Sequence, residues 1–286
     1  MEPQSDTVMP LSRLAHSQAS VGDCIYIFGG RVGIDMNETS MNDLWKFHVP
    51  TETWTHIDTK QPEEEVPEAR SFHKMIAVGT SLYLLGGCGA SGRLRDLYRY
   101  DTVENKWYKL GESTLLKGRG GPNLLFLRDA NNDPYLAVVA GFIGEETKDG
   151  HVFHLKSAAW ADSTMDGLTN LRPRSVCVFG SFYSANVGVI FGGEVNPSDR
   201  GQEGAGGFTN DVILLDGVNG KIINSVRAPS DDKNDNLNWP ERRGWSHGAT
   251  YESEDGKVNR LFVYGGLAGT DENPKRLDDL WVCDLV

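Results

Sequence analysis

Five arginines recur along this sequence, one at the start of the strand that we expect to lie innermost in each repeat. They are Arg13, Arg70, Arg119, Arg174 and Arg243. A guanidinium group presents a planar fork of N–H donors that fits carboxylate, sulfate and phosphate oxygens. Two interpretations are open: each arginine pairs with a neighbouring carboxylate, or the five converge near one axis and bind an anion. On the second interpretation all five are substrate-binding residues.

No catalytic constellation stands out elsewhere, so the catalytic residues are unknown at this stage. His16 and His73 each follow one of these arginines by three residues, which favours hydrogen bonding at a strand end. The sequence has no Gly-x-Ser-x-Gly, Walker or His-Glu-x-x-His motif. A turn at residues 129–133 resembles the start of a calcium loop. However, Pro134 and Ala140 stand where such a loop needs glycine and glutamate, which indicates a hairpin turn.

The elements that must position the arginines are short apolar strands that end at glycine. β-Branched and aromatic runs stopped by glycine predict buried strands that end where the chain needs a positive φ. Five runs share this pattern, the third with a single glycine: Ile25–Gly30, Leu82–Gly87, Ala137–Phe142, Gly188–Gly193 and Leu261–Gly266. A terminal glycine pair recurring about every 50 residues is typical of the kelch repeats of β-propellers.

A second spacing sets the register of the repeats. A tryptophan follows the aspartate of the third strand by 11 residues in three units, at Asp43–Trp54, Asp96–Trp107 and Asp149–Trp160. We therefore predict an all-β fold, a kelch-repeat β-propeller of five blades, with an incomplete six-bladed propeller as the alternative. The units are roughly 10–57, 67–110, 117–163, 172–227 and 240–286, within a single domain 1–286. The three tryptophans should be buried between blades.

The fifth unit has no fourth strand of its own, because only 7 residues follow Asp279. In propellers such a gap is normally filled from the other terminus, which removes an exposed sheet edge. The candidate here is Asp6–Met9, which is short and has no tryptophan. We expect this closure to be the weakest part of the fold.

Composition limits the classes of partner and location. The chain has 286 residues, 39% of them hydrophobic, and a net charge of −12, which disfavours binding to nucleic acid. No apolar run reaches the ~18 residues of a membrane span, and the polar, acidic start is not a secretory signal. The four cysteines are far apart, which favours free thiols in a reducing compartment. We expect a cytoplasmic protein without a membrane or nucleic-acid partner.

Several loop sequences carry a closer family resemblance, which spans nearly the whole chain. They are Gly86–Leu94, Lys117–Pro122, Gly141–Glu145, Gly192–Asp199, Arg242–Trp245 and Arg276–Asp279. In this order they resemble the nitrile-specifier, epithiospecifier and thiocyanate-forming proteins. The resemblance implies a kelch propeller that uses Fe²⁺ to divert the aglycone released from glucosinolates by myrosinase. The products would be nitrile, epithionitrile or thiocyanate.

The resemblance also implies where iron would bind, and the sequence departs from the family there. The family places a Glu-x-x-x-Asp-x-x-x-His run after the glycine pair, and the matching residues are Glu194, Ser198 and Gln202. Glu194 and the neighbouring Asp199 are the candidate metal ligands. We expect a small-molecule site on the loop face near Glu194, Asp199, Arg70 and Arg119. The alternative is a non-enzymatic protein-interaction module that uses the same face for a protein partner.

Overall fold

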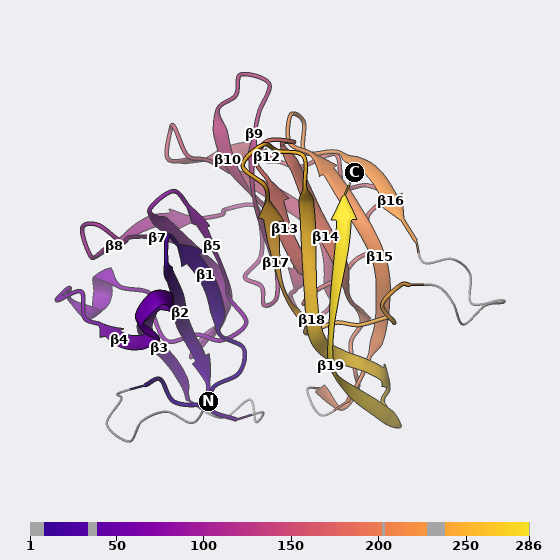
Figure 1. Ribbon diagram of the computed structural model, residues 1–286, viewed down its shortest axis with the longest axis horizontal. Helices are drawn as coiled ribbons and strands as arrows, with labels where there is room; N and C mark the ends of the chain where they lie inside the picture. Colours follow the sequence, from indigo (N-terminus) through magenta and orange to yellow (C-terminus); the bar gives the residue numbers. More distant parts are fainter. Residues whose placement is uncertain (1–8, 34–38, 202–203, 228–237, 286) are drawn as a thin grey trace. The chain divides into compact units, whose positions relative to one another are not determined.

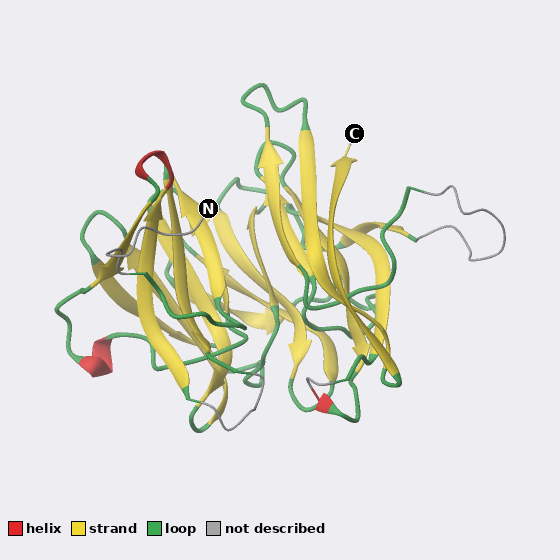
Figure 2. Ribbon diagram, turned by 60° about the horizontal axis from the view of Figure 1, so that its bottom comes forward, coloured by secondary structure: helices red, strands yellow, loops and turns green. Residues whose placement is uncertain are grey.

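The computed structural model describes residues 9–33, 39–201, 204–227 and 238–285. These residues form β-strands joined by turns and short 3₁₀ helices, among them η1 (Val49–Thr51) and η2 (Glu63–Glu65) (Figure 2). Within these ranges no helix is long and apolar enough to cross a membrane. The predicted clasp at Asp6–Met9 lies outside the described residues except for Met9. The chain divides into two compact units, residues 1–120 and 121–286, and each is described by itself.

The first unit contains two four-stranded antiparallel sheets, which we call blades 1 and 2 (Figure 1). Blade 1 consists of β1 (Ser17–Val21), β2 (Cys24–Arg31), β3 (Ser40–His48) and β4 (Thr53–Ile57). Blade 2 consists of β5 (Lys74–Val78), β6 (Ser81–Gly89), β7 (Gly92–Asp101) and β8 (Lys106–Glu112). In both blades the strands pair in sequence order, so each neighbour is reached by a short turn.

The second unit contains blades 3, 4 and 5, again with strands in sequence order. Blade 3 consists of β9 (Asn123–Arg128), β10 (Pro134–Phe142), β11 (Glu146–His154) and β12 (Ala159–Thr164). Blade 4 consists of β13 (Val178–Phe182), β14 (Val187–Asn196), β15 (Gly207–Asp216) and β16 (Ile222–Val226). Blade 5 has three strands, β17 (His247–Glu252), β18 (Asn259–Thr270) and β19 (Asn273–Leu285). The expected all-β fold with five blades is therefore confirmed.

The glycine pair forms a bulge near the end of the second strand of every blade. Strand pairing with the third strand shifts register there, for example between Leu85 and Gly87. The first position of the pair has a φ near +60° in all five blades, and in blade 3 Ala140 adopts it without a glycine. The second position needs glycine for space as well, because a Cβ on Gly87 would lie 2.6 Å from the carbonyl oxygen of Ser71.

Apolar side chains from adjacent blades interlock to form the core of each unit. In the first unit Phe28 of blade 1 packs with Leu84, Tyr100 and Trp107 of blade 2. Trp107 is 3% exposed and its ring lies 5.3 Å from that of Phe28, as the repeat predicted. Trp54 and Trp160 are only half-buried, so that part of the prediction was wrong for them. Each contacts an aromatic side chain of its own blade instead.

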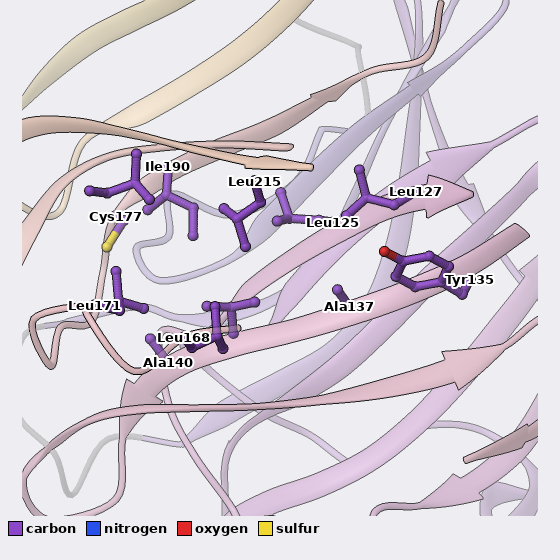
Figure 3. Close-up of a cluster of buried hydrophobic side chains, with 12 residues drawn as sticks. Leu125, Leu127, Tyr135, Ala137, Ala140, Leu168, Leu171, Cys177, Ile190 and Leu215 are labelled. Carbon is purple, nitrogen blue, oxygen red and sulfur yellow. The ribbon is translucent and has the colours of Figure 1, made fainter. Parts of the chain in front are cut away.

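The second unit has two such interfaces between blades. One cluster joins blades 3 and 4 through Leu125, Ala137, Cys177, Ile190 and Leu215 (Figure 3). Another joins blades 4 and 5. Cys177 is buried in the first cluster, and all four cysteines are free thiols. A cytoplasmic location stays a prediction.

Replacing Trp107 with alanine should destabilise the protein by about 3–5 kcal/mol, because it leaves a cavity between blades 1 and 2. Urea denaturation followed by circular dichroism measures the change. Trp54→Ala is the matched control and should cost less, since Trp54 is half-buried. Equal losses in the two variants would contradict the packing described here.

Candidate functional site

The repeated arginines donate hydrogen bonds to carboxylate and carbonyl oxygens of the protein. In blade 2 the two terminal nitrogens of Arg70 lie 2.6 and 2.9 Å from the carboxylate oxygens of Asp96. Its Nη1 also donates to the carbonyl oxygen of Gly86 at 3.0 Å, and its Nε to that of Glu68 at 3.0 Å. The Arg70 side chain is fully buried. Its guanidinium group is therefore held in place by the protein itself.

The same arrangement recurs in blades 1, 4 and 5. The two-pronged ion pairs are Arg13–Asp43, Arg174–Asp211 and Arg243–Asp279, with closest distances of 2.6, 2.8 and 2.5 Å. Hydrogen bonds from Arg243 lower the pKa of Asp279 to about 2, which keeps that carboxylate charged at neutral pH. In blade 3 Arg119 is equally buried, and its Nε donates to the carbonyl oxygen of Lys117 at 3.1 Å.

The sequence left two interpretations open. This geometry favours pairing with carboxylates for the arginines of blades 1, 2, 4 and 5, which are Arg13, Arg70, Arg174 and Arg243. A direct contact between these five arginines and a substrate stays a prediction. The positions of Arg70, Arg174 and Arg243 suggest a different role, because each is also joined to the preceding blade through its backbone. The amide of Gly30 donates to the carbonyl of Arg70, and the amide of Gly193 donates to that of Arg243. The arginines thus fasten adjacent blades within each unit.

His73 also belongs to this framework. Its Nε2 lies 3.1 Å from the carbonyl oxygen of Phe28 in the preceding blade, and its ring stands edge-on to the Phe28 ring. Burial, assisted by the positive charge of Arg70, holds the pKa of His73 well below its ordinary value. The imidazole is therefore neutral at pH 7, as a structural histidine bridging two blades would be.

Glu194 is a buried carboxyl side chain that lies outside the arginine–aspartate framework. It follows the glycine pair of blade 4 directly and is 7% exposed. Its carboxyl group accepts hydrogen bonds from the backbone amides of Ser198 and Gly206. A side chain at Gly206 would be too close, since a Cβ there would lie 2.5 Å from Glu194 Oε1. The loop after β14 thus folds back over this one carboxyl group.

Two more acidic side chains lie near Glu194, each from another blade. Burial is the main cause that raises the pKa of Glu194 to about 8, and the charges of Glu146 and Asp271 add to it. Glu146 begins β11 in blade 3, and burial raises its pKa too. Its Oε1 accepts a hydrogen bond from Ser175 Oγ at 3.3 Å. Asp271 comes from the turn between β18 and β19 in blade 5.

Hydrogen bonds and apolar contacts close the loop around these acids. Ser198 Oγ donates to Asp271 Oδ1 at 2.5 Å, and the Arg200 guanidinium donates to the Asp271 carbonyl oxygen at 2.7 Å. A small apolar cluster lies in the same region and consists of Ala205, Phe208 and Leu267, with Trp245 packed against it. We call Glu194, Glu146, Asp271, Ser198 and this cluster the Glu194 site.

The metal ligands implied by the family resemblance are only partly in place. Glu194 is buried but engaged by two backbone amides, Ser198 is bonded to Asp271, and Asp199 is exposed. Gln202 lies outside the described residues. In the described part of the chain, no three His, Cys, Asp or Glu side chains lie close enough together to hold a metal ion. Iron binding at Glu194 and Asp199 therefore stays a prediction, and we derive no step through iron.

The sequence identified Glu194 but missed Glu146 and Asp271. Glu146 and Asp271 belong to other repeats, and Asp271 is 77 residues from Glu194 (271 − 194). Their one sequence signal was that each lies in or directly beside the turn between the second and third strands of its own blade. Loops at this place in neighbouring blades converge at one end of a propeller, so an acidic residue there could have been suspected.

Comparison with known proteins assigns the family. Residues 1–193 match the model of the KLHDC2/KLHL20/DRC7 Kelch-repeats domain. The chain belongs to this kelch-repeat family. Its five blades are accordingly blades of a kelch β-propeller, which confirms the fold class expected from the glycine repeat.

Two curated relatives show how far the similarity extends. The chain is 26% identical over 298 aligned residues to N-(sulfonatooxy)prop-2-enimidothioate sulfolyase of Thlaspi arvense, covering 98% of this chain and 79% of that protein. It is 25% identical over 226 residues to host cell factor 1 of Homo sapiens, covering 77% of this chain. That alignment spans only 10% of host cell factor 1. The alignment with the Thlaspi protein thus covers nearly the whole of this chain.

Replacing Asp96 with alanine should destabilise the first unit by about 3–5 kcal/mol, because it leaves the buried Arg70 without a counter-charge. Denaturant unfolding at pH 7 measures the loss. The double variant Arg70→Met with Asp96→Leu should recover a large part of it, since no unpaired charge then stays buried. A double variant no more stable than Asp96→Ala would show that shape, not charge, dominates this site.

Glu194 should make the protein less stable as the pH rises from about 4.5 to 8. Its folded pKa of about 8 lies above the ordinary value of 4.5, so the carboxyl group favours the folded state only while it is protonated. That contribution is complete below pH 4.5 and is lost as the pH rises through 8. Glu194→Gln should remove this slope, and its stability relative to the wild type should grow toward pH 8. Glu254→Gln, an exposed substitution in the same unit, should leave the slope unchanged.

Proposed function

We propose that this protein binds a small molecule at the Glu194 site. The observation that carries the proposal is a carboxyl group that is 7% exposed, has a pKa raised to about 8 and lies near acidic side chains of blades 3 and 5. A fold-stabilising role would be better served by a neutral amide, because two of its neighbours are acidic. Perturbed acids held by converging loops are typical of binding and catalytic sites.

The most specific form of this proposal is a specifier-like activity. The Thlaspi relative is named for a substrate with a sulfonatooxy group on an imidothioate, and a substrate of that class is the first to test here. Protonated Glu194 can donate a hydrogen bond to a sulfonatooxy oxygen. Arg200, exposed beside Asp271, offers positive charge for the same group, and the Trp245 cluster offers apolar contact for its side chain. Such a protein would divert a glucosinolate aglycone toward nitrile.

A product assay tests this function. Allyl glucosinolate is incubated with myrosinase and this protein, with and without Fe²⁺, and nitrile and isothiocyanate are measured by gas chromatography. We expect the nitrile fraction to rise above that of myrosinase alone, and Glu194→Ala, which removes the hydrogen-bond donor, to abolish the rise. Glu254→Gln is the matched control and should behave as the wild type. A product mixture identical to that of myrosinase alone at every iron concentration would refute the specifier role.

The role of iron is tested separately. Ferrous iron is titrated anaerobically into the wild type, Glu194→Ala and Gln202→His. Binding by the wild type that is lost in Glu194→Ala would support an iron-dependent site. Binding that appears only in Gln202→His would show that the family's metal site has lapsed and that ligand binding here does not use iron.

A second candidate function is a protein-interaction module. The observation that favours it is the apolar surface of blade 5, where Tyr251, Tyr264, Leu280 and Val282 are 49–61% exposed. Exposed apolar patches of this kind commonly mark surfaces that bind other proteins. This candidate places the partner on blade 5 and not on the Glu194 site, so the two functions are compatible.

A further inference from the structure

Blades 1 and 2 are joined through the segment that leads into blade 2, residues 70–73, which we call the entry segment. Both blades belong to the first unit, so the joint between them is internal to that unit. The backbone amides of Arg70 and Phe72 donate to the carbonyl oxygens of Met41 and Ala15, at 3.0 and 2.8 Å. These acceptors lie in β3 and directly before β1. The entry segment is therefore held by the backbone of the preceding blade.

The His73 side chain completes this joint. Its Nε2 lies 3.1 Å from the carbonyl oxygen of Phe28 in β2, and the centres of the two rings are 5.4 Å apart. Because a carbonyl oxygen only accepts, Nε2 carries the proton of the neutral ring and Nδ1 carries none. His73 is 1% exposed, and among the described residues its Nδ1 has no hydrogen-bond partner. A second proton would have to be placed at Nδ1, where no acceptor meets it.

Close backbone packing leaves the imidazole little room to turn toward another acceptor. A Cβ on Gly87 would lie 2.8 Å from His73 Cβ, and a Cβ on Gly29 would lie 3.1 Å from His73 Cε1. The glycines of two blades thus enclose the side chain. Phe72, the residue before it, has a φ of +57°, a conformation that aromatic residues rarely adopt. The closed joint therefore holds a strained residue beside the histidine.

The charges around His73 also oppose its protonation. In the described part of the chain, the groups that act on it are Arg70 and Lys74 from its own segment and His16 at the start of blade 1. The framework aspartate of blade 2, Asp96, is already bound by both terminal nitrogens of Arg70. Burial, followed by the charge of Arg70, accordingly lowers the pKa of His73. A protonated His73 in the closed joint would be a buried cation with an unsatisfied N–H group.

The second unit has no imidazole at this place in its repeats. The residue three positions after the repeated arginine is His16 in blade 1 and His73 in blade 2. In blades 3, 4 and 5 the same position is Pro122, Cys177 and Ser246. None of these three side chains gains a proton between pH 7 and 5. An effect of acid through this position is therefore confined to the first unit.

We propose that the joint between blades 1 and 2 is an acid-sensitive switch, closed while His73 is neutral and opened when His73 is protonated. Opening moves the entry segment away from blade 1, which brings the imidazolium into water and relieves the strain at Phe72. A histidine in the open joint binds its proton near pH 6.5, whereas the closed joint excludes that proton. The closed joint is therefore fully favoured above pH 6.5. The equilibrium constant for opening rises by up to about tenfold for each pH unit below that value. The switch is independent of any ligand at the Glu194 site.

Amide hydrogen exchange of the full chain, followed by mass spectrometry, tests the switch. Peptides covering residues 67–78 are compared at about pH 7.5, 6.5 and 5.5, with rates corrected for the intrinsic effect of pH on exchange. Between the two lower values we expect the opening constant to rise about tenfold in the wild type. It should stay constant in His73→Gln, whose amide N–H can still donate to the Phe28 carbonyl. His56→Gln, an exposed substitution in the same unit, should behave as the wild type. Peptides covering residues 171–182, the equivalent segment of blade 4, should show no rise.

A second measurement on the wild type keeps the test decisive if His73→Gln fails to fold. Exchange of the imidazole Cε1–H with deuterium, located by mass spectrometry, gives the pKa of His73 directly, and we expect it well below 6.5. A pKa of His73 at or above that value would overturn the proposal. An opening constant that does not rise in the wild type, or rises equally in His73→Gln, would overturn it too. A rise of equal size in blades 2 and 4 would show that acid acts on the whole fold and not on this joint.

Discussion

The buried arginine–aspartate pair is the interaction on which the rest of each unit depends. It joins the segment that enters a blade to the third strand of that blade, through two parallel N–H···O contacts. The same guanidinium also holds the first carbonyl of the glycine pair, at Gly86 in blade 2. Three separate segments of one blade are thus fixed around a single cation. Such a cation is stable in the interior only because every acceptor is in place.

The glycine pair follows from this arrangement. The chain must turn sharply to direct a carbonyl at the arginine of its own blade and an amide at the arginine of the next. The turn requires a positive φ at the first position, and the close approach of the preceding segment excludes a side chain at the second. Ala140 shows which requirement is weaker, because a small residue tolerates the first position at φ +60°. No blade replaces the second glycine.

This explains why the sequence predicted the framework well and the site only in part. Glycine spacing and the arginines are local and repeat in every unit, and the Asp–Trp interval repeats in three, so the fold class and Trp107 followed from pattern. Glu194 was found because it adjoins a glycine pair. Glu146 and Asp271 lie in other repeats, and only the folded blades bring their charges near Glu194. The packing of Trp54 and Trp160 likewise depended on neighbours that spacing does not specify.

Two carboxyl groups of the second unit differ in pKa according to the charged groups around them. Asp279 accepts hydrogen bonds from the Arg243 guanidinium group and has a pKa of about 2, so it stays charged across the physiological pH range. Glu194 is buried beside the acidic Glu146 and Asp271, and these influences raise its pKa to about 8. Both residues lie on strands of the blades. The difference between their pKa values therefore depends on whether the arginine of the repeat contacts them. The arginine of the repeat serves the third strand, and in blade 4 the buried Glu194 beyond the glycine pair has acidic neighbours instead. A hydrogen-bond donor bound beside Glu194 would relieve part of the electrostatic cost that the framework leaves in place there.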